Sequence, residues 1–152
     1  MKDNTVKERD LGWDRIQKEL AEAKDAAVNV GVPSDAGEHE DGTSLLVIAA
    51  ANEFGTSDGR IPSRPFIRGA FQQHQRDLYQ YSERLWNLIL QGKMTTHRAL
   101  GLMGERHQGE IRNYMTALSS PPNAPATVAK KGSANPLIDE GILRRSIVWE
   151  RE

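Results

Sequence analysis

The longest periodic pattern of the chain runs from Phe66 to Leu118: FIRGAFQQHQRDLYQYSERLWNLILQGKMTTHRALGLMGERHQGEIRNYMTAL. Apolar residues recur in its first half at seven- and four-residue steps, which predicts a long helix over 66–90. A stripe at helical spacing in its second half predicts another long helix, opened by the hydroxyl of Thr95 or Thr96. The first stripe contains Phe71, Leu78, Leu85 and Ile89, and the second contains Leu100, Met103, His107, Ile111, Tyr114 and Leu118.

Three glycines, Gly101, Gly104 and Gly109, fall inside the second long helix. Each costs about 1 kcal/mol relative to alanine in a helix interior. We therefore expect either close packing or a weak point in the helix at these positions.

Shorter elements surround this pair of helices. Near-helical spacing of Leu11, Trp13, Ile16 and Leu20 predicts an amphipathic helix over 10–24. The valine-rich segment 27–32, closed by a proline, predicts a strand, and alternation over 145–151 predicts a second strand.

A further helix is expected over 45–54, because Thr43 or Ser44 can cap its start and Gly55 can end it. Asp139 is expected to cap a short turn through Leu143. Segments 33–43 and 119–136 are rich in polar residues, glycine or proline, and they predict long flexible loops.

The expected fold is therefore α+β: a small antiparallel sheet packed against two long helices plus an N-terminal helix, in one domain over 1–152. Two strands alone are marginally stable in water. Either the loops hold further strands, or a neighbouring subunit completes the sheet.

Composition excludes several classes of protein. The 152 residues carry a net charge of -1 and no cysteine, which rules out disulfides, thiolate metal sites and cysteine nucleophiles. The longest apolar run, 45–51, is far too short to cross a bilayer. The first residues include no apolar signal segment, so we expect a protein that stays in the cytoplasm where it is made.

Charge is segregated along the middle of the chain. Segment 33–59 holds six acidic residues and no lysine or arginine, whereas 60–76 holds four arginines and no acidic residue. These blocks are either solvated surface or the two sides of a head-to-tail contact between identical subunits.

No constellation typical of catalysis or of metal binding is found. His39 lies among acidic residues in a loop, where consecutive ligands rarely form a fixed coordination shell. Lys130-Lys131-Gly132-Ser133 lacks the residue order of a phosphate-binding loop, and no nucleophile elbow is present. The chain is predicted not to be an enzyme and to need neither a metal nor a cofactor.

A basic surface is possible if the loops converge. It would use Arg60, Arg64, Arg68, Lys130, Lys131, Arg144 and Arg145. Such a surface would bind DNA through its phosphates without reading the base sequence. The alternative is that these side chains are simply solvated.

Two segments carry a family resemblance. One reads Asn52-Glu53-Phe54-Gly55-Thr56 and then Ile61-Pro62-Ser63-Arg64-Pro65-Phe66. The other begins with PPNAPATVAKKGS at 121–133 and continues Asn135-Pro136-Leu137-Ile138-Asp139-Glu140-Gly141-Ile142-Leu143-Arg144-Arg145-Ser146-Ile147. In this order they resemble the minor tail, tail-completion and neck proteins of long-tailed bacteriophages, although Glu140 stands where that family commonly has threonine.

The resemblance implies an α+β subunit of a homo-oligomeric ring, with six subunits as the expected number and no catalysis. In this reading Phe54 and Phe66 are buried anchors, while Arg64 and Arg68 point to a neighbouring subunit. An internal ion pair of Arg64 with Glu53 is the alternative. The expected interface residues are Glu53, Phe54, Arg60, Arg64, Phe66, Arg68, Lys130, Lys131, Arg144 and Trp149.

The function expected from the sequence is that of a structural virion protein that completes the tail or joins it to the head. Its partners would be copies of itself and adjoining connector, terminator or tail-tube proteins, and it would reach the virion from the host cytoplasm. The alternatives are a DNA-binding or packaging adaptor of the neck, a tail terminator, and a virion hydrolase. The hydrolase would need a catalytic role for His39 and Glu53.

Overall fold

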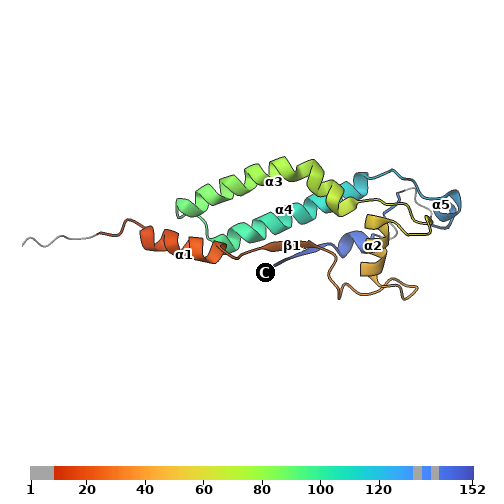
Figure 1. The fold of residues 1–152 in the computed structure, drawn as a ribbon, viewed down its shortest axis with the longest axis horizontal. Helices are drawn as coiled ribbons and strands as arrows, with labels where there is room; N and C mark the ends of the chain where they lie inside the picture. Colours follow the sequence, from red (N-terminus) through yellow and green to blue (C-terminus); the bar gives the residue numbers. More distant parts are fainter. Residues whose placement is uncertain (1–8, 132–134, 138–140) are drawn as a thin grey trace, which may run out of the picture.

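The computed structural model describes residues 9–131, 135–137 and 141–152 of the chain. Its centre is a hairpin of two long helices, α3 (Phe66–Leu90) and α4 (Thr96–Ala117), which gives the molecule an elongated shape (Figure 1). Together with a two-stranded antiparallel sheet these helices confirm the predicted α+β class. None of the described helices has the length and apolar content that a membrane span requires.

Local chemistry sets the ends of the long helices. The predicted bounds of α3 are confirmed, and α4 opens where Thr95 Oγ1 accepts a hydrogen bond of 3.3 Å from the backbone N–H of Arg98. Between the helices Gly92 has a φ of 73°, a left-handed conformation that glycine adopts without steric cost. The short predicted break is therefore a tight turn.

Helix α1 (Trp13–Ala23) is attached to the turn of this hairpin by polar side chains. Arg15 donates to the carbonyl oxygens of Ile89 and Leu90 at 2.8 and 2.9 Å, which satisfies acceptors at the end of α3. The helix begins later than predicted, because Asp10 Oδ1 accepts the backbone N–H groups of Gly12 and Trp13 and so stands before the first turn.

The sheet pairs β1 (Val28–Gly31) with β2 (Val148–Arg151), and Val30 lies opposite Trp149. Helix α4 packs on both strands, and α3 lies on the far side of α4 (Figure 1). Outside these strands, the described residues contain only an isolated bridge between Glu38 and Ser44. Among the described residues the sheet therefore has the two strands that the sequence predicted.

Two of the three helical glycines allow close packing, as expected. A Cβ on Gly104 would lie 2.5 Å from Cδ2 of Trp149, and one on Gly101 would lie 3.4 Å from its Cη2. The indole ring of β2 thus rests directly on the α4 backbone. Nothing lies within 4 Å of such a Cβ at Gly109, so packing does not explain that glycine.

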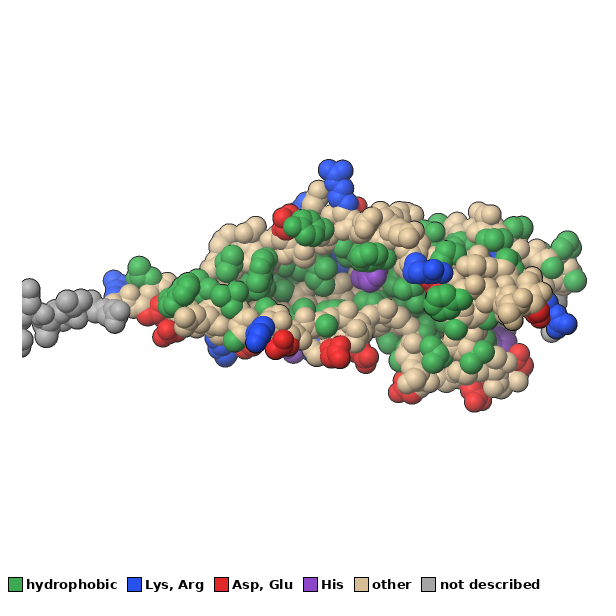
Figure 2. Space-filling model, in the orientation of Figure 1, with side chains coloured by type: hydrophobic (Ala, Val, Ile, Leu, Met, Phe, Trp, Pro, Cys, Tyr) green, Lys and Arg blue, Asp and Glu red, His purple; other side chains and the backbone are tan. Residues whose placement is uncertain are grey.

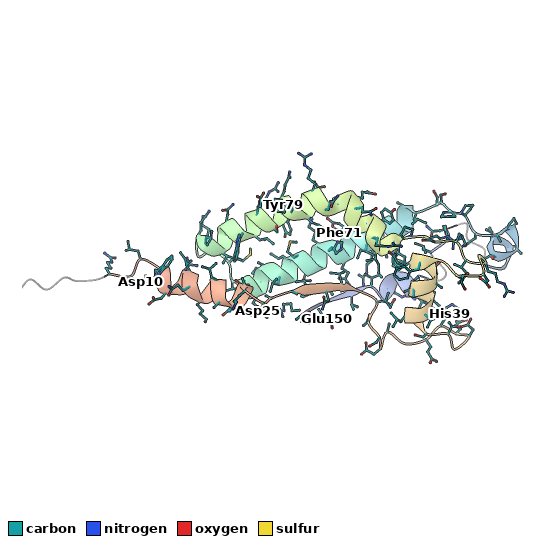
Figure 3. The ribbon with its side chains drawn as sticks, in the orientation of Figure 1. Asp10, Asp25, His39, Phe71, Tyr79 and Glu150 are labelled. Atoms are coloured by element: carbon teal, nitrogen blue, oxygen red, sulfur yellow. The ribbon has the colours of Figure 1, made fainter. Side chains whose placement is uncertain are left out.

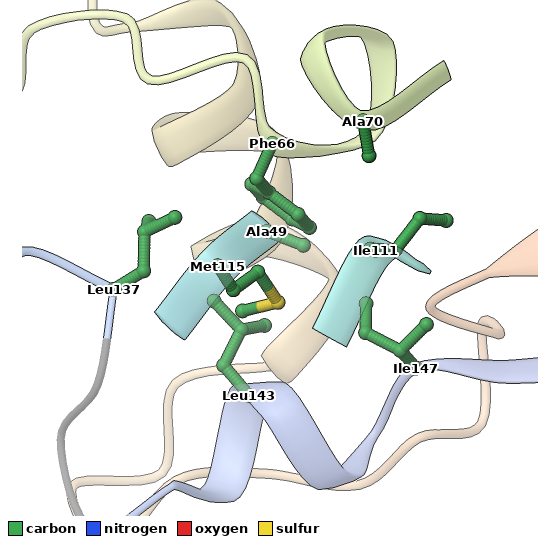
Figure 4. Close-up of a cluster of buried hydrophobic side chains, with 8 residues drawn as sticks. All are labelled: Ala49, Phe66, Ala70, Ile111, Met115, Leu137, Leu143 and Ile147. Carbon is green, nitrogen blue, oxygen red and sulfur yellow. The ribbon is translucent and has the colours of Figure 1, made fainter. Parts of the chain in front are cut away.

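The main core lies where α2 (Leu45–Phe54) meets the ends of the long helices. Phe66, Ile111, Met115 and Ile147 are its largest fully buried side chains. The cluster, drawn in Figure 4, consists of Ala49, Phe66, Ala70, Ile111, Met115, Leu137, Leu143 and Ile147. Leu85, Ile89 and Ala99 form a smaller cluster near the hairpin turn.

The structure corrects the sequence prediction in two further places. Segment 119–136 contains a helix, α5 (Pro125–Lys131), whose proline at the first position is typical of a helix start but whose length is too short to show a periodicity. Helix α6 (Ile142–Arg145) begins after Gly141 at a φ of 72°, and it delays the second strand to Val148. The expected cap at Asp139 lies outside the described residues.

Candidate assembly surfaces

Glu53 lies in the last turn of α2, and its side chain binds the first turn of α3. Its carboxylate is buried and accepts the backbone N–H groups of Ile67 at 2.9 Å and Arg68 at 3.1 Å. It also accepts a hydrogen bond of 2.9 Å from Nε of Arg68. A negative charge at a helix N-terminus is favourable, so Glu53 caps α3 from another helix.

Arg64 is the second organising residue of this region, and it points inward. Its exposed fraction is 4%, and its guanidinium donates to the carbonyl oxygens of Pro121 at 2.8 Å and Pro122 at 3.0 Å and to Asn123 Oδ1 at 3.2 Å. Burial lowers the pKa of this guanidinium. The expectation that Arg64 points to a neighbouring subunit is therefore wrong. The expected ion pair with Glu53 is also wrong, because Arg68 occupies that position.

Other residues expected at an interface also serve this chain's own fold. Phe66 is fully buried in the core, as its role as an anchor predicted. Arg144 donates to the carbonyl oxygen of Arg112 and to Thr116 Oγ1, both at 3.1 Å. Trp149 packs on the glycines of α4. Phe66, Arg144 and Trp149 therefore use most of their contact surface within the chain, and little of it remains for a neighbouring subunit.

Phe54 is the clearest correction among the predicted anchors. Phe54 is the last residue of α2 before Gly55 and is 67% exposed, with the Arg68 guanidinium 5.1 Å from its ring centroid. Arg60 is exposed and forms an ion pair of 3.2 Å with Asp58. Lys130 and Lys131 lie at the end of α5, but their side chains lie outside the described residues.

Phe54 belongs to an apolar surface that the sequence reading did not anticipate. Leu46, Val47, Ala50 and Phe54 are all exposed on α2. At 100° per residue they span an arc of about 100° on one side of the helix. We call this surface the α2 ridge. The signal in the sequence is that residues 45–51 are all apolar. A helix that is apolar on all sides is normally covered on all sides, so an exposed side of such a helix indicates a surface that a partner would cover.

A second apolar surface is a groove between α3, α4 and β1. It has a volume of about 280 Å³, and Phe71 and Tyr79 of α3 stand at its border (Figure 3). We call it the trench. Its lining includes Phe71, Leu78, Tyr79, Met103, Val28 and Val30. A further hollow of about 330 Å³ toward α1 shares Tyr79, Ser82 and Met103 with it, so the two adjoin each other.

A third exposed apolar area lies on α1. Arg15 and Glu19 turn toward the hairpin, which leaves Trp13 60% exposed and Leu20 largely outside as well. Figure 2 shows hydrophobic side chains along the elongated face of the molecule, from the α1 end to the region between α3 and β1. Contiguous apolar surface of this kind is typical of interaction sites.

The chemistry of the described residues is modest. No group of three or more His, Asp or Glu side chains in 9–131, 135–137 and 141–152 could hold a metal ion. His39 lies 3.5 Å from Asp41 in the loop before α2, and the backbone N–H of Thr43 lowers the pKa of that aspartate. Such exposed pairs in loops are ordinary surface features.

Comparison with known proteins gives no identification. No family model matches the chain, and neither a curated protein nor a solved structure matches it significantly. The function must therefore be argued from the surfaces described above.

Proposed function

We propose that this protein is a structural subunit of a tailed-phage virion, which assembles with copies of itself into a ring that completes the tail or joins it to the head. The observation that carries the proposal is the amount of apolar surface that no other described residue of the chain covers. The α2 ridge, the trench and the exposed side of α1 lie on different parts of one elongated molecule.

The total accessible area supports the same conclusion. The chain exposes 10568 Å², against about 7,700 Å² for a compact monomer of its mass. Even when every residue outside the described ranges is counted as fully extended chain, about 1,000 Å² of excess remains. This is the order of area that one partner contributes to a standard protein interface, about 800 Å².

The resemblance to tail-completion and neck proteins supports the location of the ring. The residues of its first motif brace the fold here, since Glu53 caps α3 and Arg64 binds the 121–123 segment. A motif can be characteristic of a family because it holds the shape that the subunit needs. In this proposal the contacts with neighbours come from the apolar surfaces between the braced elements.

The DNA-binding alternative receives less support from the side-chain contacts. Arg64 and Arg144 bind carbonyl oxygens of the chain, and Arg60 and Arg68 pair with acidic residues. Four of the arginines that would build a basic patch are thus occupied by intrachain contacts. A salt-sensitive mobility shift of duplex DNA at low ionic strength would favour this alternative instead.

The decisive experiment is removal of the protein from an infection. Particles assembled without it are expected to separate into filled heads and finished tails in negative-stain images, and supplying the wild-type chain in trans should restore joined virions. Finished tails of abnormal length would point to the terminator role. If normal virions assemble without the protein, the proposal is wrong.

A further inference from the structure

We propose that the ring is built head to tail, with the α2 ridge of one subunit seated in the trench of the next copy. This inference rests on the proposed function, and it names the contact by which the subunits would associate. The two surfaces are complementary in kind, since one is a convex helix side and the other is a concave groove.

The trench is suited to a helix of this length. Along α3 it extends from Phe71 to Ser82, which is about 17 Å at 1.5 Å per residue. Helix α2 has 10 residues, or about 15 Å. The trench lies over α4, with α3 on one side and β1 on the other. An amphipathic helix can lay its apolar side into a groove of this shape.

The composition of both surfaces favours burial against each other. Leu46, Val47, Ala50 and Phe54 carry no charge, although the Arg68 guanidinium lies beside Phe54. The trench beside β1 is lined by no acidic residue, lysine or arginine, and its ionisable side chains are His107 and the phenol of Tyr79. Docking would therefore desolvate little charge, which is the main cost of burying a polar surface. Phe54, Phe71 and Tyr79 would supply aromatic side chains of the type that dominates interface energies.

Charge at the border of the contact gives a register. The loop that leads into α2 exposes Asp35, Glu38, Glu40 and Asp41, whereas Arg76 is exposed next to the trench residue Gln75. Opposite charges around an apolar centre orient an encounter between two copies. Of the four arginines in segment 60–76, Arg76 is the one beside the trench, since Arg60, Arg64 and Arg68 make their contacts near α2.

Position in the fold makes the contact heterologous. Helix α2 lies near one end of the elongated molecule, and the trench runs along its middle toward α1 (Figures 1 and 2). A copy that offers its ridge to a neighbour still presents its own trench to another copy. Repetition of such a contact closes into a ring when the rotation permits.

Directed cross-linking tests this arrangement, and the absence of cysteine from the chain makes the background clean. The variant Val47→Cys is mixed with Tyr79→Cys and treated with a short bismaleimide. A cross-linked dimer is expected from the mixture, and the double variant should give a ladder that ends at the ring size. The control pairs Val47→Cys with Arg98→Cys, which is exposed on α4 outside the trench, and should give no dimer.

Charge substitution supplies an independent measurement. Val47→Glu and Tyr79→Glu change exposed side chains, so each variant should keep the wild-type circular dichroism and thermal midpoint. Each is expected to weaken self-association at least about 30-fold, in the range of an interface hot spot. An equimolar mixture of the two should form dimers but no ring, because only one ridge and one trench remain intact.

The outcomes separate the two proposals. If rings form but the Val47–Tyr79 cross-link does not, and the glutamate variants still assemble normally, the ridge-to-trench contact is wrong. The proposed ring function would remain. A chain that stays monomeric at every concentration in sedimentation overturns the contact as well. The ring function itself is tested by the particle images, which do not depend on either variant.

Discussion

The carboxylate of Glu53 lies 2.9 Å from the backbone nitrogen of Ile67, so the last turn of one helix caps the first turn of the next. Thr96 at the start of α4 has the same relationship with Glu19, whose carboxylate accepts its backbone N–H at 2.6 Å. Both long helices are thus capped by a glutamate from another helix. These two contacts tie the short helices to the hairpin and set where the apolar surfaces of α1 and α2 face.

Replacement of Glu53 should destabilise the fold. Glu53→Ala leaves the N–H groups of Ile67 and Arg68 without their buried acceptor, and we expect a loss of about 1–3 kcal/mol in the free energy of unfolding. Glu53→Gln should lose less, because its amide oxygen still accepts one hydrogen bond. Urea denaturation measures both, with the exposed Glu22→Gln as a control. Equal stability of Glu53→Ala and wild type would contradict the capping role.

Arg64 should not be replaceable by lysine. The planar guanidinium donates hydrogen bonds to three acceptors in the 121–123 segment. The ammonium group of lysine carries its donors on one nitrogen and cannot reach all three acceptors in this geometry. Arg64→Lys is expected to lower the free energy of unfolding by about 1–3 kcal/mol. Hydrogen exchange around residues 119–124 should accelerate in the same variant. Unchanged exchange in that segment would show that Arg64 does not hold it.

Two glycines of α4 should respond in opposite directions to alanine. Gly104→Ala places a methyl group against the Trp149 ring, and overpacking of this kind costs about 1–3 kcal/mol. Gly109 has open space around it, so Gly109→Ala should stabilise the protein by up to about 1 kcal/mol through helix propensity. Thermal midpoints of the two variants provide the measurement. A stabilised Gly104→Ala would contradict the packing of Trp149 on α4.

Glu19 should make stability depend on pH. The backbone N–H of Thr96 holds the pKa of the Glu19 carboxyl below its ordinary value. A carboxyl whose folded pKa is depressed contributes stability that is present above its unfolded pKa and is lost as the pH falls through the folded value. Glu19→Gln should therefore be less stable than wild type at pH 7, and the difference should shrink below about pH 4. A difference that is independent of pH would exclude this carboxylate as its source.

Much of the local structure followed from neighbouring residues. The bounds of α2, the Thr95 cap of α4 and the ends at Gly55 and Gly92 depend on groups within a few positions of one another. The helical period of 66–90 likewise predicted the extent of α3, although its cap, Glu53, comes from another helix. The short helix α5 was not predicted, because its seven residues are too few to show a helical periodicity of apolar side chains. Helix α6 was expected only as a turn, since its anchor Leu143 is buried by distant parts of the chain.

The candidate site was harder to predict because residue type does not say which way a side chain faces. Arg64 resembles a surface cation, yet it is buried because its acceptors arrive from 57 and 58 residues further along the chain. Phe54 resembles a core residue, yet it is exposed because it lies on the same outward side of α2 as Leu46 and Val47. The apolar run 45–51 was the available signal for the α2 ridge.

The amino-acid order therefore determined the long helices, the Thr95 cap of α4 and the glycine ends at Gly55 and Gly92, because these features arise from short-range hydrogen bonds and backbone preferences. The packing of α1, α2 and β1 around the hairpin decided which charged residues turn inward and which apolar residues stay outside. That choice depends on acceptors and surfaces brought together from distant parts of the chain, so it exists only in the folded protein.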